Sequence, residues 1–87
     1  MAARHAVVFA RSARKELEEL EPSLAARILT RIEALGAEPR PAGCRKLRGA
    51  NDLWRLRIGD YRVIYAVSDR ARTVDVVAVR HRSKAYG

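Results

Sequence analysis

The segment LWRLRIGDYRVIY, residues 53–65, constrains the fold most strongly, because apolar and polar side chains alternate on both sides of a Gly-Asp pair. Alternation of this kind is typical of strands that bury one face. Glycine in the first position of a two-residue loop favours a type II′ turn. We therefore predict a β-hairpin in which Ile58 pairs with Tyr61 and Arg57 pairs with Arg62.

This register sorts the side chains onto two faces of the predicted sheet. The mainly apolar face, which we expect to pack under helices, carries Trp54, Leu56, Ile58, Tyr61, Val63, Tyr65 and Val67. The opposite face carries Arg55, Arg57, Arg62, Ile64 and Ala66. A shift of one residue would exchange the two faces and bury the arginines, so the alternation specifies the register.

The three arginines on the second face need a physical reason. Arg57 lies directly across from Arg62, and like charges in that position destabilise a sheet by roughly 0.2–1 kcal/mol. The planar guanidinium group matches the oxygens of a phosphate. Our hypothesis is that a phosphate between the two side chains converts their repulsion into shared attraction. In the alternative reading, the strand ends splay and water screens each guanidinium separately.

The rest of the chain supplies elements that surround the hairpin. The predicted strands cover residues 5–9, 53–58, 61–68 and 73–80. Ser12 is predicted to cap a first helix, and a second helix is expected to begin at Pro22 and stop at Gly36. Residues 37–52 read as a loop. We predict one α+β domain over residues 1–87, in which the N-terminal strand and a two-helix antiparallel hairpin pack on one face of a small, twisted, mainly antiparallel sheet.

Positive charge is concentrated in the second half of the chain. Residues 40–87 hold twelve Lys and Arg against four Asp, which accounts for the whole net charge of +8. A field this one-sided attracts phosphate polyanions or an acidic partner protein. The tail beyond the last strand adds further cationic and aromatic candidates, namely Arg80, His81, Arg82, Lys84 and Tyr86.

Other features bear on location and cofactors. Cys44 is the single cysteine, so no internal disulfide can form. No apolar run approaches the length of a membrane span, and Arg11 interrupts a segment that faintly resembles a secretion signal. We expect a cytoplasmic protein without membrane contact. The sequence has no cluster of carboxylates or histidines suited to a metal, and no cofactor is expected.

The segment KLRGANDLWRLRIGDYRVIYAVSDRARTVDVVAVRHRSKAY resembles the second half of the RelE/ParE superfamily of toxins from bacterial toxin–antitoxin pairs. Family members share an L-x-G element, a W/Y-R-I/L-R-x-G-x-Y-R-x-x-Y stretch, a valine-rich strand ending in a basic pair, and a tyrosine soon after. The first half of the chain also fits, with a strand and a helical hairpin. The resemblance implies a RelE-like fold over the whole chain.

The resemblance to the RelE branch implies an endonuclease that cuts messenger RNA in the ribosomal A site and inhibits translation, using the RNA 2′-hydroxyl as nucleophile and no metal. By this resemblance, Arg55, Arg57 and Arg62 grip the scissile phosphate, and Arg82 stabilises the transition state, with Arg80 as the alternative. Tyr86 stacks on a base or assists proton transfer. Further RNA contacts are expected from Lys46, Arg48, Arg80 and Lys84.

One departure from the family pattern concerns proton transfer. Some relatives carry lysines where this chain has Arg55 and Arg57, and arginine stays charged in proteins. A proton must therefore be moved by another group. Tyr86 and His81 are the two candidates, and His81 is also open to reading as a strand-end residue that only hydrogen-bonds the backbone.

Two other functions stay open at this stage. The ParE branch inhibits DNA gyrase without cutting RNA, and fold alone does not separate the branches. A catalytically weak toxin that chiefly binds its antitoxin is the third reading. The resemblance implies a cognate antitoxin partner in each case, with promoter DNA bound only through the toxin–antitoxin complex.

Overall fold

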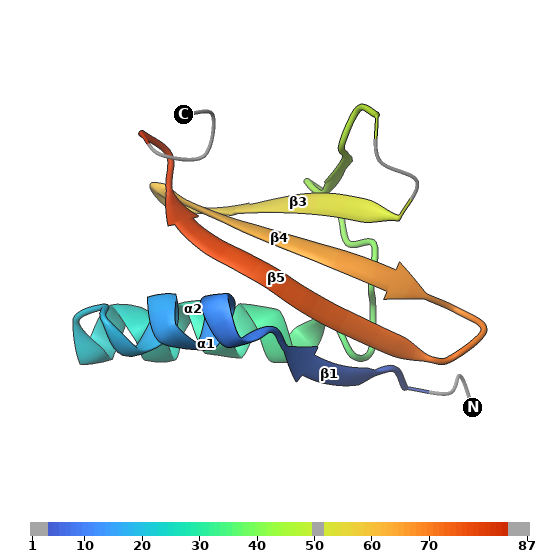
Figure 1. Ribbon diagram of the computed structural model, residues 1–87, viewed down its shortest axis with the longest axis horizontal. Coiled ribbons are helices and arrows are strands. Elements are labelled where there is room, and N and C mark those ends of the chain that lie inside the picture. The colour runs from blue at the N-terminus through green and yellow to red at the C-terminus, as the bar shows by residue number, and fades with distance from the viewer. Residues whose placement is uncertain (1–3, 50–51, 84–87) are drawn as a thin grey trace.

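A computed structural model describes residues 4–49 and 52–83 of the chain. The elements are β1 (Ala6–Phe9), α1 (Arg11–Glu18), α2 (Pro22–Ala34), β2 (Arg45–Lys46), β3 (Leu53–Ile58), β4 (Tyr61–Ser68) and β5 (Thr73–His81). The strands form one sheet in the order β1-β5-β4-β3-β2. Only the β1–β5 pair is parallel, and both helices lie on one side of the sheet (Figure 1). The predicted α+β architecture is confirmed.

The β3–β4 hairpin has the predicted register. Ile58 pairs with Tyr61, and Arg57 pairs with Arg62. Gly59 has a φ of 59°, whereas the only non-glycine residue with a positive φ among the described residues is Arg72. A positive φ at the first loop position alone is the type II′ geometry, which a glycine adopts without strain.

The core lies between the helices and the inner face of the sheet. Alternate residues of β3 and β4 are buried there, as predicted, together with residues of β5 and α2; the core includes Ile28, Ile32, Leu35, Leu56, Ile58, Val63, Tyr65, Val67, Val74 and Val76. Trp54 and Tyr61 are partly buried and pack against this cluster. The outer face of the sheet is left without a helical cover.

The start of α1 differs from the prediction that Ser12 caps it. Ala10 is the N-cap residue, and Ser12 lies within the helix with its hydroxyl donating to the carbonyl of Val77 at 3.0 Å. Val77 is an extra residue in β5, because Ile64 pairs with Ala78 while Tyr65 pairs with Val76. The hydroxyl thus binds a carbonyl at a β-bulge, a partner that local sequence cannot reveal.

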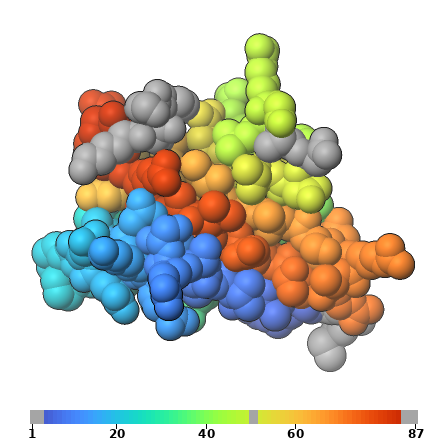
Figure 2. All heavy atoms as spheres, in the orientation of Figure 1, coloured from blue at the N-terminus to red at the C-terminus, as the bar shows by residue number. Residues whose placement is uncertain are grey.

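The edge of β5 beyond β1 is covered by α1, which lies against this strand in the space-filling view (Figure 2). Glu16 of α1 accepts hydrogen bonds from the backbone N–H of Val79 at 2.9 Å and from Nε of Arg80 at 3.3 Å. Here a side chain satisfies a backbone donor that has no neighbouring strand, as buried edges require.

The second helix follows the prediction closely. Pro22 occupies the first turn, and the carboxylate of Glu21 accepts hydrogen bonds from the backbone N–H groups of Ser23 and Leu24. The hydrogen bond from the Ser23 hydroxyl at 2.6 Å, with these backbone bonds, holds the pKa of Glu21 below its usual value.

No helix in the described part of the chain is long and apolar enough to cross a lipid bilayer.

The predicted loop over residues 37–52 contains one short strand that the sequence did not indicate. The two residues of β2, Arg45 and Lys46, pair with Arg55 and Trp54 of β3. The segment before β2 is anchored by Tyr65, whose buried hydroxyl donates to the carbonyl of Pro39 at 2.8 Å. Burial raises the pKa of the Tyr65 phenol well above its ordinary value, so it stays a donor at physiological pH.

Candidate anion-binding site on the outer sheet face

A hollow lined by Gly43, Arg45, Arg55, Arg57 and Arg62 opens on the outer face of the sheet and has a volume of about 400 Å³. We refer to it as the arginine hollow. Every charged side chain that residues 4–49 and 52–83 contribute to this lining is cationic. The three arginines predicted from the hairpin therefore meet in one place, and Arg45 joins them.

The sheet register explains how four arginines reach one hollow. Arg45 pairs with Arg55 across β2 and β3, and Arg57 pairs with Arg62 across β3 and β4. Paired strands lie about 4.8 Å apart, and residues two apart on one strand lie about 6.6 Å apart on the same face. The two arginine pairs therefore lie close enough together for their guanidinium groups to donate to the oxygens of a single phosphate group.

The four side chains differ in how freely they can move. Arg55 and Arg62 are half-buried, whereas Arg45 and Arg57 are exposed. Nε of Arg57 donates to the carbonyl of Gly59 at 3.3 Å, which ties its stem to the hairpin loop. The planar guanidinium fork of arginine loses less freedom per hydrogen bond formed than a lysine ammonium does, and its paired donors suit oxyanions.

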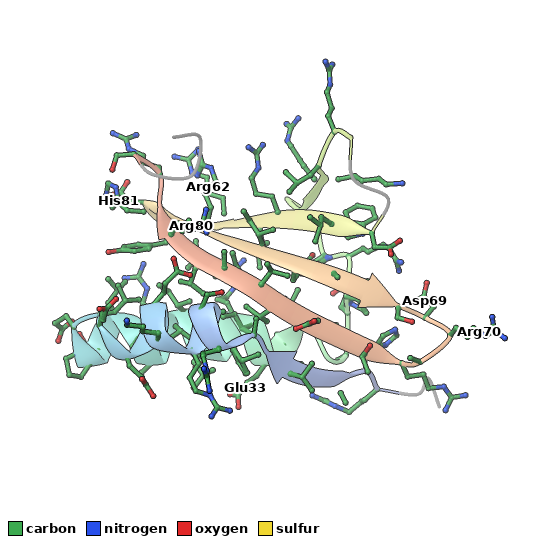
Figure 3. All side chains as sticks on the ribbon, in the orientation of Figure 1. Glu33, Arg62, Asp69, Arg70, Arg80 and His81 are labelled. Carbon is green, nitrogen blue, oxygen red and sulfur yellow. The ribbon has the colours of Figure 1, made fainter. Side chains whose placement is uncertain are left out.

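Arg80 extends the line of arginines to the next strand, because it pairs with Arg62 across β4 and β5. Figure 3 shows both side chains near the same end of the sheet. Its charge is already matched by Glu16, through an Nε–Oε2 contact of 3.3 Å. Arg82 follows the end of β5 and is exposed, with its backbone N–H donating to Asp60 at 2.7 Å.

His81 lies on the opposite face of the sheet from the arginine hollow. It pairs with Tyr61, and the two rings meet edge to face with centroids 5.3 Å apart. Nδ1 accepts a hydrogen bond from the backbone N–H of Ser83 at 3.2 Å and contacts its hydroxyl at 2.9 Å. The neutral ring therefore carries its proton on Nε2. The structure does not bring His81 together with Arg55, Arg57 and Arg62.

The remaining predicted residues fall in several places. Lys46 pairs with Trp54, whose ring packs toward the core. Lys46 therefore lies on the inner face of the sheet, whereas Arg45 lies on the outer face. Arg48 is exposed in the turn after β2. Lys84 and Tyr86 lie outside the described residues. Arg45 was missed because a two-residue strand carries no alternation from which its face could be predicted.

No three His, Cys, Asp or Glu side chains come together as metal ligands within residues 4–49 and 52–83. Away from the arginine hollow, Asp69 forms hydrogen bonds with two charged or titratable side chains, Arg40 and His5. Its carboxylate accepts from both terminal nitrogens of Arg40, at 3.3 and 3.0 Å, and contacts Nε2 of His5 at 3.0 Å. These hydrogen bonds, chiefly those from Arg40, lower the pKa of Asp69.

A helical hairpin beneath a five-stranded, mainly antiparallel sheet is the fold of the RelE/ParE class of toxins. The family model for the ParE toxin of the type II toxin–antitoxin system parDE matches residues 7–86. The chain belongs to this family and is a toxin of a type II toxin–antitoxin system.

Similar proteins carry RelE-type names. Toxin RelG of Mycobacterium tuberculosis is 30% identical over 83 residues, which cover 94% of this chain and 95% of RelG. A chain of the toxin–antitoxin complex RelBE2 from the same organism superposes with a TM-score of 0.81 at 29% identity, covering 92% of this chain and 100% of that one. A chain of the archaeal RelE-RelB complex from Pyrococcus horikoshii has a TM-score of 0.81 at 31% identity, with 94% and 99% covered.

Proposed function

We propose that this toxin is a ribosome-dependent endoribonuclease that cuts messenger RNA in the ribosomal A site and thereby inhibits translation and arrests growth. The observation that carries the proposal is the arginine hollow, a space of about 400 Å³ to which the described part of the chain contributes four arginines and no carboxylate. A site of this kind favours a phosphodiester over a neutral or cationic substrate. Its place of action is the cytoplasm, where messenger RNA is translated.

The proposed chemistry needs a phosphate held in place and its developing charge stabilised. The 2′-oxygen of the RNA bonds to phosphorus as the bond from phosphorus to the 5′-oxygen breaks. The products are a 2′,3′-cyclic phosphate and a 5′-hydroxyl, and the proton lost by the 2′-hydroxyl balances the one gained by the 5′-oxygen. Preorganised donors from Arg55, Arg57 and Arg62 stabilise the charge that builds on the phosphate oxygens.

A further arginine at the end of the sheet completes the charge stabilisation. Arg82 and Arg80 are the two candidates. Arg80 is the cross-strand partner of Arg62 but is paired with Glu16 at 3.3 Å, whereas Arg82 is exposed at the end of β5. We assign proton transfer to Tyr86 rather than His81, since the His81 ring faces Tyr61 and uses Nδ1 as an acceptor.

A cognate antitoxin is the proposed protein partner, and promoter DNA is bound only through their complex. Two of the similar solved chains come from toxin–antitoxin complexes. Apolar surface for such a partner is present on the helical side at Leu29 of α2, which is 37% exposed. Val8 of β1, which is 46% exposed, adds apolar surface on the outer face of the sheet, where it pairs with Asp75. An acidic antitoxin segment over the arginine hollow would neutralise it.

Inhibition of DNA gyrase is the second candidate, favoured by the match to the ParE family model. A toxin of that kind does not need an arginine hollow that fits a phosphodiester. The two candidates differ in whether RNA is cut, and one experiment therefore separates them.

The experiment adds the purified toxin to a translation system and maps the ends of the RNA with and without ribosomes. We expect cuts within translated codons that need ribosomes and are lost in Arg62→Ala. The matched control is Arg70→Ala, which removes the same charge from the exposed β4–β5 turn and should leave cleavage unchanged. Intact RNA together with inhibited supercoiling by gyrase would favour the second candidate and overturn the first.

A further inference from the structure

We propose that Arg40 and Asp69 form a clamp that sets the position of Arg45, so that a contact at one end of the sheet decides whether the arginine hollow grips RNA with four guanidinium groups or with three. The inference rests on the proposed function, since it takes the phosphates of RNA as the ligand of the hollow. Arg45 is then a phosphate-binding residue, and Arg40 and Asp69 are positioning residues.

The clamp is a set of contacts around the guanidinium group of Arg40. Its two terminal nitrogens bind the two carboxylate oxygens of Asp69, at 3.3 and 3.0 Å. The same guanidinium lies over the ring of Trp54, with Cζ 5.3 Å from the ring centroid. A forked ion pair combined with stacking fixes the plane of the group, which a single charge contact would not do.

The clamp joins three segments that are far apart in the sequence. Asp69 lies in the turn between β4 and β5, Arg40 lies in the loop before β2, and Trp54 belongs to β3. Figure 3 shows Asp69 beyond the end of β4, at the opposite end of the sheet from Arg62. Any effect of Asp69 on the arginine hollow must therefore pass through the intervening chain.

The chain between Arg40 and Arg45 is the path for that effect. β2 has two residues, so its few ladder bonds hold Arg45 weakly on their own. The loop leading into it is fixed by the hydrogen bond from Tyr65 to Pro39, by the Arg40 contacts, and by a turn in which the N–H of Cys44 donates to Pro41 at 3.1 Å. Releasing Arg40 leaves Arg45 and Gly43, both in the lining of the hollow, less firmly placed.

The ion pair itself is solvent-exposed, with the side chains of Arg40 and Asp69 40% and 63% accessible. Exposed pairs of this kind add little to stability. A role limited to stability therefore predicts almost no consequence of breaking the pair, whereas a role in positioning predicts a change in binding.

The first test asks whether Arg45 binds phosphate. A short fluorescein-labelled polyuridine oligonucleotide is titrated with the toxin at several salt concentrations. Loss of one phosphate contact makes the slope of log K against log salt shallower by about 0.7 for single-stranded nucleic acid. We expect this change, with binding weakened severalfold, for Arg45→Met. The control Arg31→Met removes an exposed charge from α2 on the helical side and should leave the slope unchanged.

The second test asks whether the clamp acts through Arg45. Asp69→Asn and the control Asp75→Asn each remove one exposed carboxylate, which by charge alone should tighten RNA binding. The clamp predicts the opposite sign for Asp69→Asn, namely weaker binding and a shallower slope. In the Arg45→Met background, Asp69→Asn should no longer weaken binding. Fluorescence of Trp54, the single tryptophan of the chain, should change in Asp69→Asn and stay constant in Asp75→Asn.

The outcomes separate this inference from the proposed function. If Arg62→Ala binds the oligonucleotide as tightly as the unmodified toxin, the proposed function fails. If Arg62→Ala weakens binding but Arg45→Met does not, the role of Arg45 is wrong. If Arg45→Met weakens binding while Asp69→Asn tightens it as Asp75→Asn does, the clamp is wrong and Arg45 is placed by β2 alone.

Discussion

Arg57 and Arg62 face each other in register across the β3–β4 hairpin, on the side of the sheet that no helix covers. Both line the same hollow. A sheet that served only to hold the fold together would gain from an opposite charge at one of these positions. An anionic ligand, as proposed above, would offset the repulsion between the two side chains.

The cost of this arrangement can be measured in the absence of RNA. Arg57→Gln removes one member of the like-charged pair and should raise the free energy of unfolding by roughly 0.2–1 kcal/mol at low salt. The gain should shrink at high salt, because salt screens exposed charges. Urea unfolding at two salt concentrations measures it, with Arg70→Gln as the control. A loss of stability in Arg57→Gln would mean that the residue serves the fold.

The placement of His81 leads to a prediction about pH. Because its ring lies against Tyr61 on the far face of the sheet, His81→Gln should leave the acid limb of the pH–rate profile of RNA cleavage unchanged. Loss of the edge-to-face ring contact should lower stability by about 0.5–1.5 kcal/mol. Disappearance of the acid limb in the variant would put His81 back among the catalytic residues.

The hydrogen bonds from Arg40 and His5 lower the pKa of Asp69 in the folded state. A carboxyl with a depressed pKa stabilises the fold above its unfolded pKa of about 3.9, and this contribution is lost as pH falls through the lower, folded pKa. Because the ion pair is exposed and adds little to stability, the melting temperature of Asp69→Asn should fall only slightly below that of the unmodified toxin at neutral pH and converge with it in strong acid. Differential scanning fluorimetry between neutral pH and strong acid measures this difference, and a gap in melting temperature that does not close in acid would contradict the prediction.

Arg45 and Lys46 are neighbours that the structure assigns to different faces of the sheet. Lys46→Met should therefore reduce the salt dependence of RNA binding by less than Arg45→Met, although both remove one positive charge. The oligonucleotide titration described above measures the two slopes. Equal slopes for the two variants would mean that the face on which the charge lies does not matter.

The hairpin could be predicted from the sequence because its information is local. Alternation with a period of two fixes the buried face, and Gly59 fixes the turn. From these two facts follow the register and the meeting of Arg57 with Arg62. The second helix was equally accessible, since Pro22 marks its start and apolar residues recur at helical spacing up to Leu35.

The features that escaped prediction depend on partners distant in sequence. The hydroxyl of Ser12 binds Val77, which is 65 residues away, instead of capping α1. Arg40 binds Asp69 across 29 residues, and Arg45 reaches the hollow through a strand too short to show a pattern. His81 was predicted near the arginines because the last strand was expected to end at residue 80, which left His81 in the tail. The strand β5 runs on to His81, and the alternation of the strand carries the His81 ring to the inner face.

The central claim is that the outer face of the sheet binds the phosphates of RNA through its paired arginines. Thermal unfolding of the toxin and of Arg62→Gln, each with and without the polyuridine oligonucleotide, tests it most directly. Ligand at about ten times its dissociation constant stabilises the folded state by roughly 1.4 kcal/mol, which raises the melting temperature of a domain of this size by about 6–11 °C. We predict this rise for the unmodified toxin and a much smaller one for Arg62→Gln. Equal rises in the two proteins would contradict the claim.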